Sequence, residues 1–126
     1  MAALVAARRN DVAQLITVAG NLDQAAWTDE HRLLPLTGSL NPADYADKLG
    51  ALPQLHLVGG RDWIVGAGVA RAFQARFPAD RRPELKIFPD YDHRCCWAEK
   101  WPEIYAGVIG KAAEHRKEAA GGEGNK

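Results

Sequence analysis

The chain has 126 residues, and its 16 Lys and Arg balance its 16 Asp and Glu, so the formal net charge at pH 7 is zero. This length suffices for one domain and hardly for two, and a 47% apolar composition allows a packed core. The balanced charge gives no electrostatic reason to expect nucleic acid or an anionic membrane as partner, and no window approaches the roughly twenty apolar residues of a membrane span.

The first half of the chain predicts a helix, a strand and a second helix. The stretch AALVAARR at 2–9 favours a helix with no capping residue before it. VAQLITVAG at 12–20 is β-branched and apolar on both sides, which is typical of a buried parallel strand. We expect residues 20–40 to be irregular. Asn41 and Pro42 then provide a cap and a first helical position for the helix NPADYADKL.

The second half predicts two more strands, each followed by a helix. PQLHLVGG at 53–60 and ELKIFP at 84–89 are expected to be strands, and an apolar residue at every fourth position predicts a helix over 66–77. A long closing helix begins at Trp97, with an apolar face formed by Trp101, Ile104, Tyr105, Val108 and Ala112. The tail 118–126 is expected to be disordered, which leaves 1–117 as the domain.

Alternating helices and strands predict an α/β fold. We expect a three-layer sandwich in which a parallel sheet of about three strands carries helices on both faces. Right-handed crossovers would place the strands in sequence order.

Two polar residues follow neighbouring strands of this predicted sheet. Asp62 comes just after the strand at 53–60, and His93 comes just after the strand at 84–89. Ligands and catalytic groups of open parallel sheets gather at the carboxyl ends of the strands, so the two loops should face each other. A carboxylate there could hold one imidazole nitrogen and leave the other to take a proton. In a purely structural interpretation, Asp62 pairs with Arg61 or caps the next helix, and His93 is satisfied by Asp90 or Asp92.

Around these residues the sequence resembles an enzyme family. HLVGGRDWIV at 56–65 and IFPDYDHRCCW at 87–97 resemble the acid and histidine segments of an α/β-hydrolase, of the kind found in bacterial serine hydrolases and esterases. MAALVAARR is similar to the helix that follows the nucleophile elbow, and LITVAGNLDQAAW to the sixth strand and the start of the lid region. The resemblance implies hydrolysis of an ester or related acyl substrate by a Ser-His-Asp mechanism, in which Asp62 orients His93. No cofactor is implied.

The sequence departs from this family in one respect. The family's serine lies in a Gly-x-Ser-x-Gly turn before the helix that opens this chain, and no such motif occurs here. The chain therefore resembles the carboxyl-terminal half of a hydrolase, and alone we expect it to be inactive. A different interpretation is a non-catalytic, truncated or pseudo-enzyme half that acts through association with another chain. In the resembled fold the strand at 12–20 pairs with a strand that is missing here, so its exposed edge predicts self-association.

Other candidate groups are less favoured. Ser39, the only serine, lies in the irregular connection, and Cys95 and Cys96 would have to fold back on their own base. We interpret the cysteines as small packing residues. Asp23, after the first strand, is a second candidate for the acid, or else a cap for a helix around Trp27.

Metal and nucleotide sites are also disfavoured. His93, Cys95 and Cys96 are too close together to converge on a metal, and the other histidines, His31, His56 and His115, are scattered. We expect His56 to be a satisfied core histidine. The stretch VGAGVAR at 65–71 lacks the third glycine of a dinucleotide-binding turn.

The cellular compartment is expected to be the cytoplasm. The two cysteines are neighbours and imply no disulfide framework, which favours a reducing compartment. The opening MAALVAARRN has its arginines after the apolar part, the reverse of a secretory signal, although a longer parent could carry an export signal ahead of Met1.

Overall fold

The computed structural model describes residues 1–36 and 38–108. The chain divides into two compact units, Met1–Arg94 and the part from Cys95 onward. The first unit contains a parallel sheet of three strands in the order β1-β2-β3, formed by Leu15–Val18, Gln54–Gly59 and Glu84–Phe88. The predicted α/β class, with helices around a three-stranded parallel sheet in sequence order, is confirmed.

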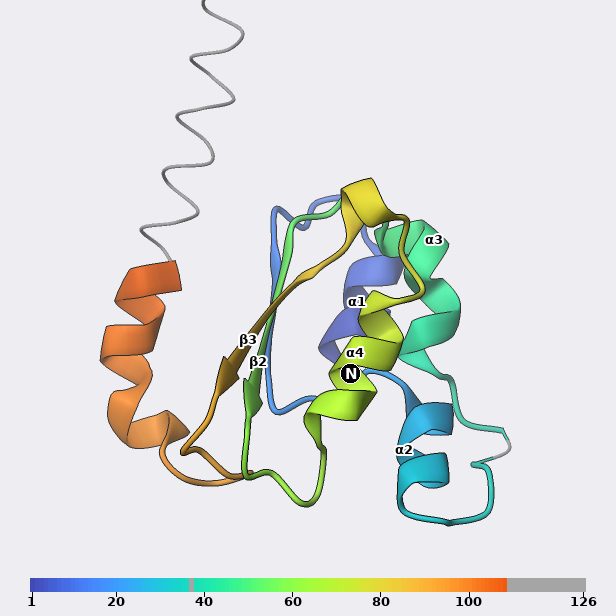
Figure 1. The fold of residues 1–126 in the computed structure, drawn as a ribbon. Helices are drawn as coiled ribbons and strands as arrows, with labels where there is room; N and C mark the ends of the chain where they lie inside the picture. Colours follow the sequence, from blue (N-terminus) through green and yellow to red (C-terminus); the bar gives the residue numbers. More distant parts are fainter. Residues whose placement is uncertain (37, 109–126) are drawn as a thin grey trace, which may run out of the picture. The chain divides into compact units, whose positions relative to one another are not determined.

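The helices of the first unit lie on one side of this sheet (Figure 1). They include short 3-10 turns as well as α-helices. In chain order they are α1 (Ala2–Arg8), α2 (Gln24–Glu30), η1 (Pro42–Tyr45), α3 (Ala46–Leu49), α4 (Ala67–Gln74) and η2 (Ala79–Arg81).

The core of the first unit forms where these helices meet the sheet. All six residues of β2 are buried, as expected for the central strand of a three-stranded parallel sheet. Phe73 of α4 and Leu49 of α3 are almost fully buried, and Ala3 and Ala6 present the small face of α1 to the same core. The Thr17–His56 pair of the β1–β2 register also lies on this face, since the His56 ring packs edge-on against Phe73.

Several predicted boundaries were wrong. Residues 24–30 form α2, although the whole stretch 20–40 was expected to be irregular; Asp23 caps this helix, and its alanines favour it. The helix predicted over 66–77 ends at Gln74. The helix expected from Asn41 begins as the 3-10 turn η1 and continues as α3, with Asn41 as the cap.

Strand β1 is less buried than predicted. Only Leu15 is buried, while the other three residues are half-buried. The reason is its place at the edge of the sheet: β1 pairs with β2, and no other strand among the described residues pairs with its outer side.

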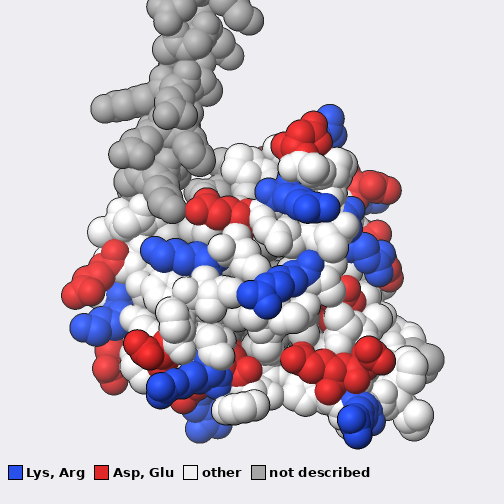
Figure 2. Space-filling view, viewed as in Figure 1, with Lys and Arg blue, Asp and Glu red and all other residues white. Residues whose placement is uncertain are grey.

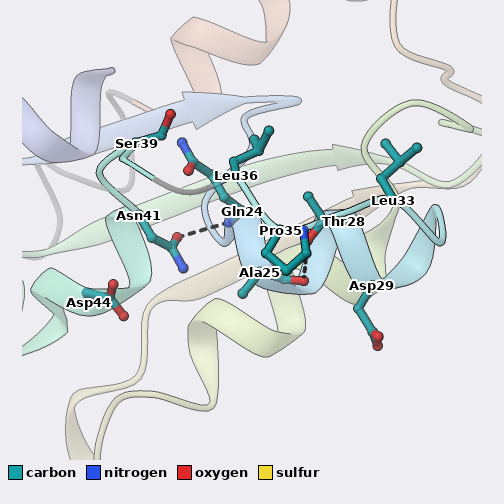
Figure 3. A pocket seen from close by; sticks show the side chains of 10 residues that line it. All are labelled: Gln24, Ala25, Thr28, Asp29, Leu33, Pro35, Leu36, Ser39, Asn41 and Asp44. Carbon is teal, nitrogen blue, oxygen red and sulfur yellow. Dashed lines mark hydrogen bonds between the residues drawn. The ribbon is translucent and has the colours of Figure 1, made fainter.

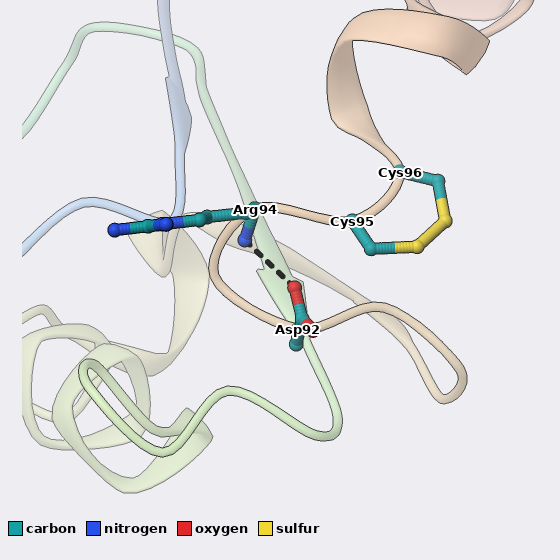
Figure 4. The surroundings of a disulfide bond; sticks show 4 residues. All are labelled: Asp92, Arg94, Cys95 and Cys96. Atoms are coloured by element: carbon teal, nitrogen blue, oxygen red, sulfur yellow. Dashed lines mark hydrogen bonds between the residues drawn. A yellow bond between two sulfur atoms is a disulfide. The ribbon is translucent and has the colours of Figure 1, made fainter.

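The second unit begins with a disulfide between Cys95 and Cys96, followed by helical residues 97–108 (Figure 4). The closing helix is thus confirmed as far as the structure describes it. Trp97 and Val108 are buried, but Tyr105 is 47% exposed, so it does not belong to the buried face. Ala112, His115 and the predicted tail 118–126 lie outside the described residues. The single domain over 1–117 stays a prediction.

Acidic and basic side chains are interspersed over the face seen in Figure 2. This mixture agrees with the balanced composition. Within 1–36 and 38–108, no helix has the length and hydrophobicity needed to cross a bilayer.

Candidate active site

Asp62 and His93 meet at the carboxyl ends of β2 and β3. His93 Nδ1 lies 2.9 Å from Asp62 Oδ2. The prediction that their side chains face each other within hydrogen-bonding distance is confirmed. An ionised carboxylate can only accept hydrogen bonds, so the proton of this contact belongs to Nδ1.

A close approach of two loops creates this pairing. Gly60 N donates to Phe88 O at 2.8 Å, and Arg61 N donates to Tyr91 O at 2.9 Å. A Cβ atom on Gly59 would lie 2.5 Å from Tyr91 O, and one on Gly60 would lie 2.8 Å from Pro89 Cα. The two glycines therefore let the loop after β2 lie directly against the loop after β3.

The Asp62 side chain is fully buried, and both of its oxygens are engaged. While Oδ2 accepts from His93, Oδ1 accepts from Ile64 N and Val65 N, each at 2.8 Å. A backbone N–H can only donate and a carboxylate oxygen accepts, so these contacts fix the direction in which the carboxylate points. Asp62 is therefore held as an acceptor in one orientation.

None of the purely structural interpretations describes this pair. Arg61 lies 3.9 Å from Asp90 rather than beside Asp62, and Asp92 Oδ1 accepts from Arg94 N (Figure 4). Helix α4 has Gly66 as its cap residue, so the amides that Asp62 holds precede that helix.

The second ring nitrogen of His93 is suited to take up a proton. The side chain is 34% exposed. Among the described residues, no hydrogen-bond partner reaches Nε2. With the proton on Nδ1, the lone pair of Nε2 can accept one from a hydroxyl. The arrangement can thus act as an oriented general base.

Asp23, the other candidate acid, is a helix cap. Its Oδ1 accepts from Ala26 N at 3.2 Å and from Asn41 Nδ2 at 3.1 Å. The Asn41 amide oxygen in turn accepts from Gln24 N at 2.9 Å. These bonds match the structural interpretation of Asp23 as the cap of the helix around Trp27.

Ser39 lines a cavity of about 340 Å³ that does not include the Asp62–His93 pair. The lining side chains come from α2, from the connection that follows it and, with Asp44, from η1, and they include neither Asp62 nor His93 (Figure 3). The structure does not bring Ser39 to the candidate base.

The cysteines do not supply a thiolate in this structure. Cys95 and Cys96 are bonded to each other, and a nucleophile requires the reduced, ionised thiol. The interpretation of both as packing residues is wrong for Cys95, which is exposed. Their bond joins neighbours only and links no distant segments.

His56 is a satisfied core histidine, as expected. Its ring is 2% exposed and lies 2.6 Å from Thr17 Oγ1 and 3.0 Å from Gln54 Oε1. Burial lowers its pKa to about 4, so the neutral ring is strongly favoured. No cluster of metal-ligating side chains occurs in the part of the chain that the structure describes.

Two residues beside the pair were missed by the sequence analysis. Trp27 Nε1 and His31 Nε2, both on or next to α2, lie 2.7 Å and 2.8 Å from Ile64 O. The expectation that residues 20–40 are irregular hid them. Their spacing of four residues would have placed them on one face of a helix.

Comparisons with known proteins give a structural likeness only. No family model and no curated protein matches the chain. The fold is similar to that of the esterase Pf2001 from Pyrococcus furiosus. The TM-score is 0.59 at 16% identity for its P21 crystal form, and 0.53 at 20% identity for its P212121 form. Each alignment covers 90% of this chain and 49% of the esterase. The chain thus spans about half the length of that esterase.

Proposed function

We propose that this chain carries the acid and the base of a serine hydrolase that cleaves an ester or a related acyl compound. His93 Nε2 takes the proton of the nucleophile and then passes it to the leaving group, while Asp62 fixes the ring and stabilises its protonated form. The observation that carries the proposal is the 2.9 Å hydrogen bond between buried Asp62 and half-exposed His93. The likeness of the fold to an esterase supports it.

The nucleophile belongs to a polypeptide segment outside this sequence. Within residues 1–36 and 38–108, no serine or cysteine side chain is hydrogen-bonded to Nε2, and the sequence has no Gly-x-Ser-x-Gly turn. By the resemblance to α/β-hydrolases, α1 corresponds to the helix that follows the nucleophile. The proposed chemistry uses a small acyl substrate and no cofactor.

The first test uses the chain alone with a short-chain nitrophenyl ester. We expect hydrolysis no faster than that by free imidazole, because most of the rate enhancement requires the nucleophile and an oxyanion hole. Substituting Ser39→Ala or Cys96→Ala should change nothing. Turnover that either substitution abolishes would overturn the proposal and identify a nucleophile within the chain.

The second test extends the chain with the coding sequence that precedes the codon of Met1. If that sequence encodes a Gly-x-Ser-x-Gly turn, the extended protein should hydrolyse the ester, and His93→Ala or Asp62→Ala should lower kcat by at least about a thousandfold. Asp90→Ala, which removes an 88% exposed carboxylate from the loop after β3, serves as the matched control and should leave kcat within about threefold. Full activity without His93 would refute the assignment.

A second candidate function is association without catalysis, through the outer edge of β1. A groove of about 250 Å³ runs beside this edge, lined by Ile16 to Val18 and by the start of α1. Asn21, which also lines the groove, has a buried Oδ1 that accepts no hydrogen bond from any residue that the structure describes. Unpaired strand edges are templates for pairing with another chain. We propose a second copy of this chain as the occupant, because β1 carries no charge and the formal net charge of zero gives copies no overall repulsion.

Sedimentation velocity tests the association. The chain should sediment as a dimer or larger species, and Ile16→Lys should shift it toward the monomer because a lysine blunts a strand edge. Leu34→Lys, at a side chain that is 88% exposed and remote from β1 in the sequence, is the control. A monomer in which the amides of β1 are strongly protected would exclude pairing through this edge.

A further inference from the structure

The backbone carbonyl of Ile64 accepts two hydrogen bonds from α2 and its end. The Trp27 indole donates from Nε1 at 2.7 Å, and the His31 ring donates from Nε2 at 2.8 Å. A carbonyl oxygen has two lone pairs, so the two side chains use its full capacity. The two rings also contact each other, with centroids 5.1 Å apart.

This carbonyl belongs to the same peptide unit as the N–H of Val65. A peptide unit is planar and almost rigid, so fixing the direction of the Ile64 carbonyl also fixes the direction of the Val65 N–H. That N–H donates to Asp62 Oδ1 at 2.8 Å. This rigid peptide unit is therefore hydrogen-bonded to side chains of α2 and its end through the carbonyl, and to Asp62 through the N–H.

Helix α2 is itself well anchored. Its amino end is fixed by the Asp23 cap and by Asn41. Near its carboxyl end, the Glu30 carboxylate lies so close to Gly66 that a Cβ there would be 2.9 Å from Glu30 Oε1. The helix thus touches the 62–66 turn at more than one point and can serve as a rigid support for it.

We propose that Trp27 and His31 are positioning residues, which hold the Asp62 carboxylate in the orientation that binds His93. Neither side chain touches the reacting atoms; each acts through the Ile64–Val65 peptide. This inference rests on the proposed function for its catalytic meaning. Its structural content is that removing the two donors loosens Asp62 and, through it, the His93 ring.

The test uses the whole chain labelled with ¹⁵N and three substitutions that remove or preserve a donor. Trp27→Phe and His31→Phe keep an aromatic ring and lose the N–H, whereas His31→Gln keeps an N–H donor. Trp63→Phe is the matched control, because Trp63 lies in the same turn but is 86% exposed. The readouts are amide hydrogen exchange at Val65 and at Leu57 of β2, and the downfield signal of the His93 Nδ1 proton.

Each lost donor should speed exchange at Val65 by about fivefold, since a hydrogen bond contributes about 1 kcal/mol net. The double variant, which combines Trp27→Phe with His31→Phe, should also lose the His93 Nδ1 signal through faster exchange with water. Leu57, on the central strand, should keep its exchange rate in every variant. His31→Gln should restore the behaviour of the unsubstituted chain, and Trp63→Phe should not differ from it.

Two results would overturn the proposal. In one, the double variant keeps both the Val65 protection and the His93 signal. In the other, Val65 and Leu57 lose protection equally, which would mean that the two side chains only stabilise the fold. The readouts need no turnover, so an inactive extended protein would contradict the proposed function without affecting this result.

Discussion

Replacing Gly59 by alanine should separate the two loops that form the Asp62–His93 pair. The new Cβ would lie 2.5 Å from Tyr91 O and 2.9 Å from Asp92 O, both of them backbone atoms that cannot swing aside. Ordinary contact begins near 3.4 Å, so the Tyr91 backbone must withdraw by about 0.9 Å. Overpacking of this kind costs about 1–3 kcal/mol, and the Arg61–Tyr91 backbone hydrogen bond would be lost as well. We expect a total loss of about 2–4 kcal/mol.

Urea unfolding measures this loss, and the His93 Nδ1 proton signal reports whether the pair survives. Gly68→Ala is the control: it lies in α4, the nearest atom to a new Cβ would be 3.9 Å away, and it should stabilise the fold by up to about 1 kcal/mol. If the free energy of unfolding of Gly59→Ala lies within about 0.5 kcal/mol of that of the unsubstituted chain and the His93 signal is kept, the close approach of the two loops is not what positions the pair.

Three further outcomes concern stability. The folded-state pKa of His56 is depressed from 6.5 to about 4, so the stability from its neutral ring is fully present above pH 6.5 and is lost as pH falls through 4. Urea unfolding measured across this pH range should show that the free energy of unfolding falls by about 3 kcal/mol, and this fall should be missing in His56→Gln. Asp23→Ala should cost about 0.5–2 kcal/mol by removing the α2 cap, visible as a lower thermal midpoint; an unchanged midpoint would argue against the cap. Leu49→Ala should cost about 2–5 kcal/mol in the same assay because Leu49 is 1% exposed, and a cost below 1 kcal/mol would mean that the cavity collapses.

The sheet and the pairing of Asp62 with His93 could be predicted from the sequence because both depend on local signals. Strand β2 is a short apolar run ended by two glycines, and parallel strands bring the residues after their carboxyl ends together. Two strands in sequence order were enough to place the acid beside the histidine.

The contacts between α2 and the turn that holds Asp62 could not be predicted in the same way. The bonds from Trp27 and His31 to Ile64 O span more than thirty residues, and they exist only because α2 lies against the 62–66 turn. Helix α2 has seven residues, which is too few for a clear apolar period. Pro35 and Gly38 are helix breakers, and for that reason the whole stretch 20–40 was predicted to be irregular. Only the alternative in which Asp23 caps a helix around Trp27 anticipated α2.

The full occupation of the Asp62 carboxylate makes the site sensitive to a change of one atom. In Asp62→Asn, the amide oxygen must take the place of Oδ1, because Ile64 N and Val65 N both donate there. The amide NH2 would then face His93 Nδ1 and donate to it, which moves the ring proton to Nε2. A substitution that preserves the shape of the side chain and its backbone contacts would thus change the tautomer of the His93 imidazole. Its Nε2 would then donate a proton where it now accepts one.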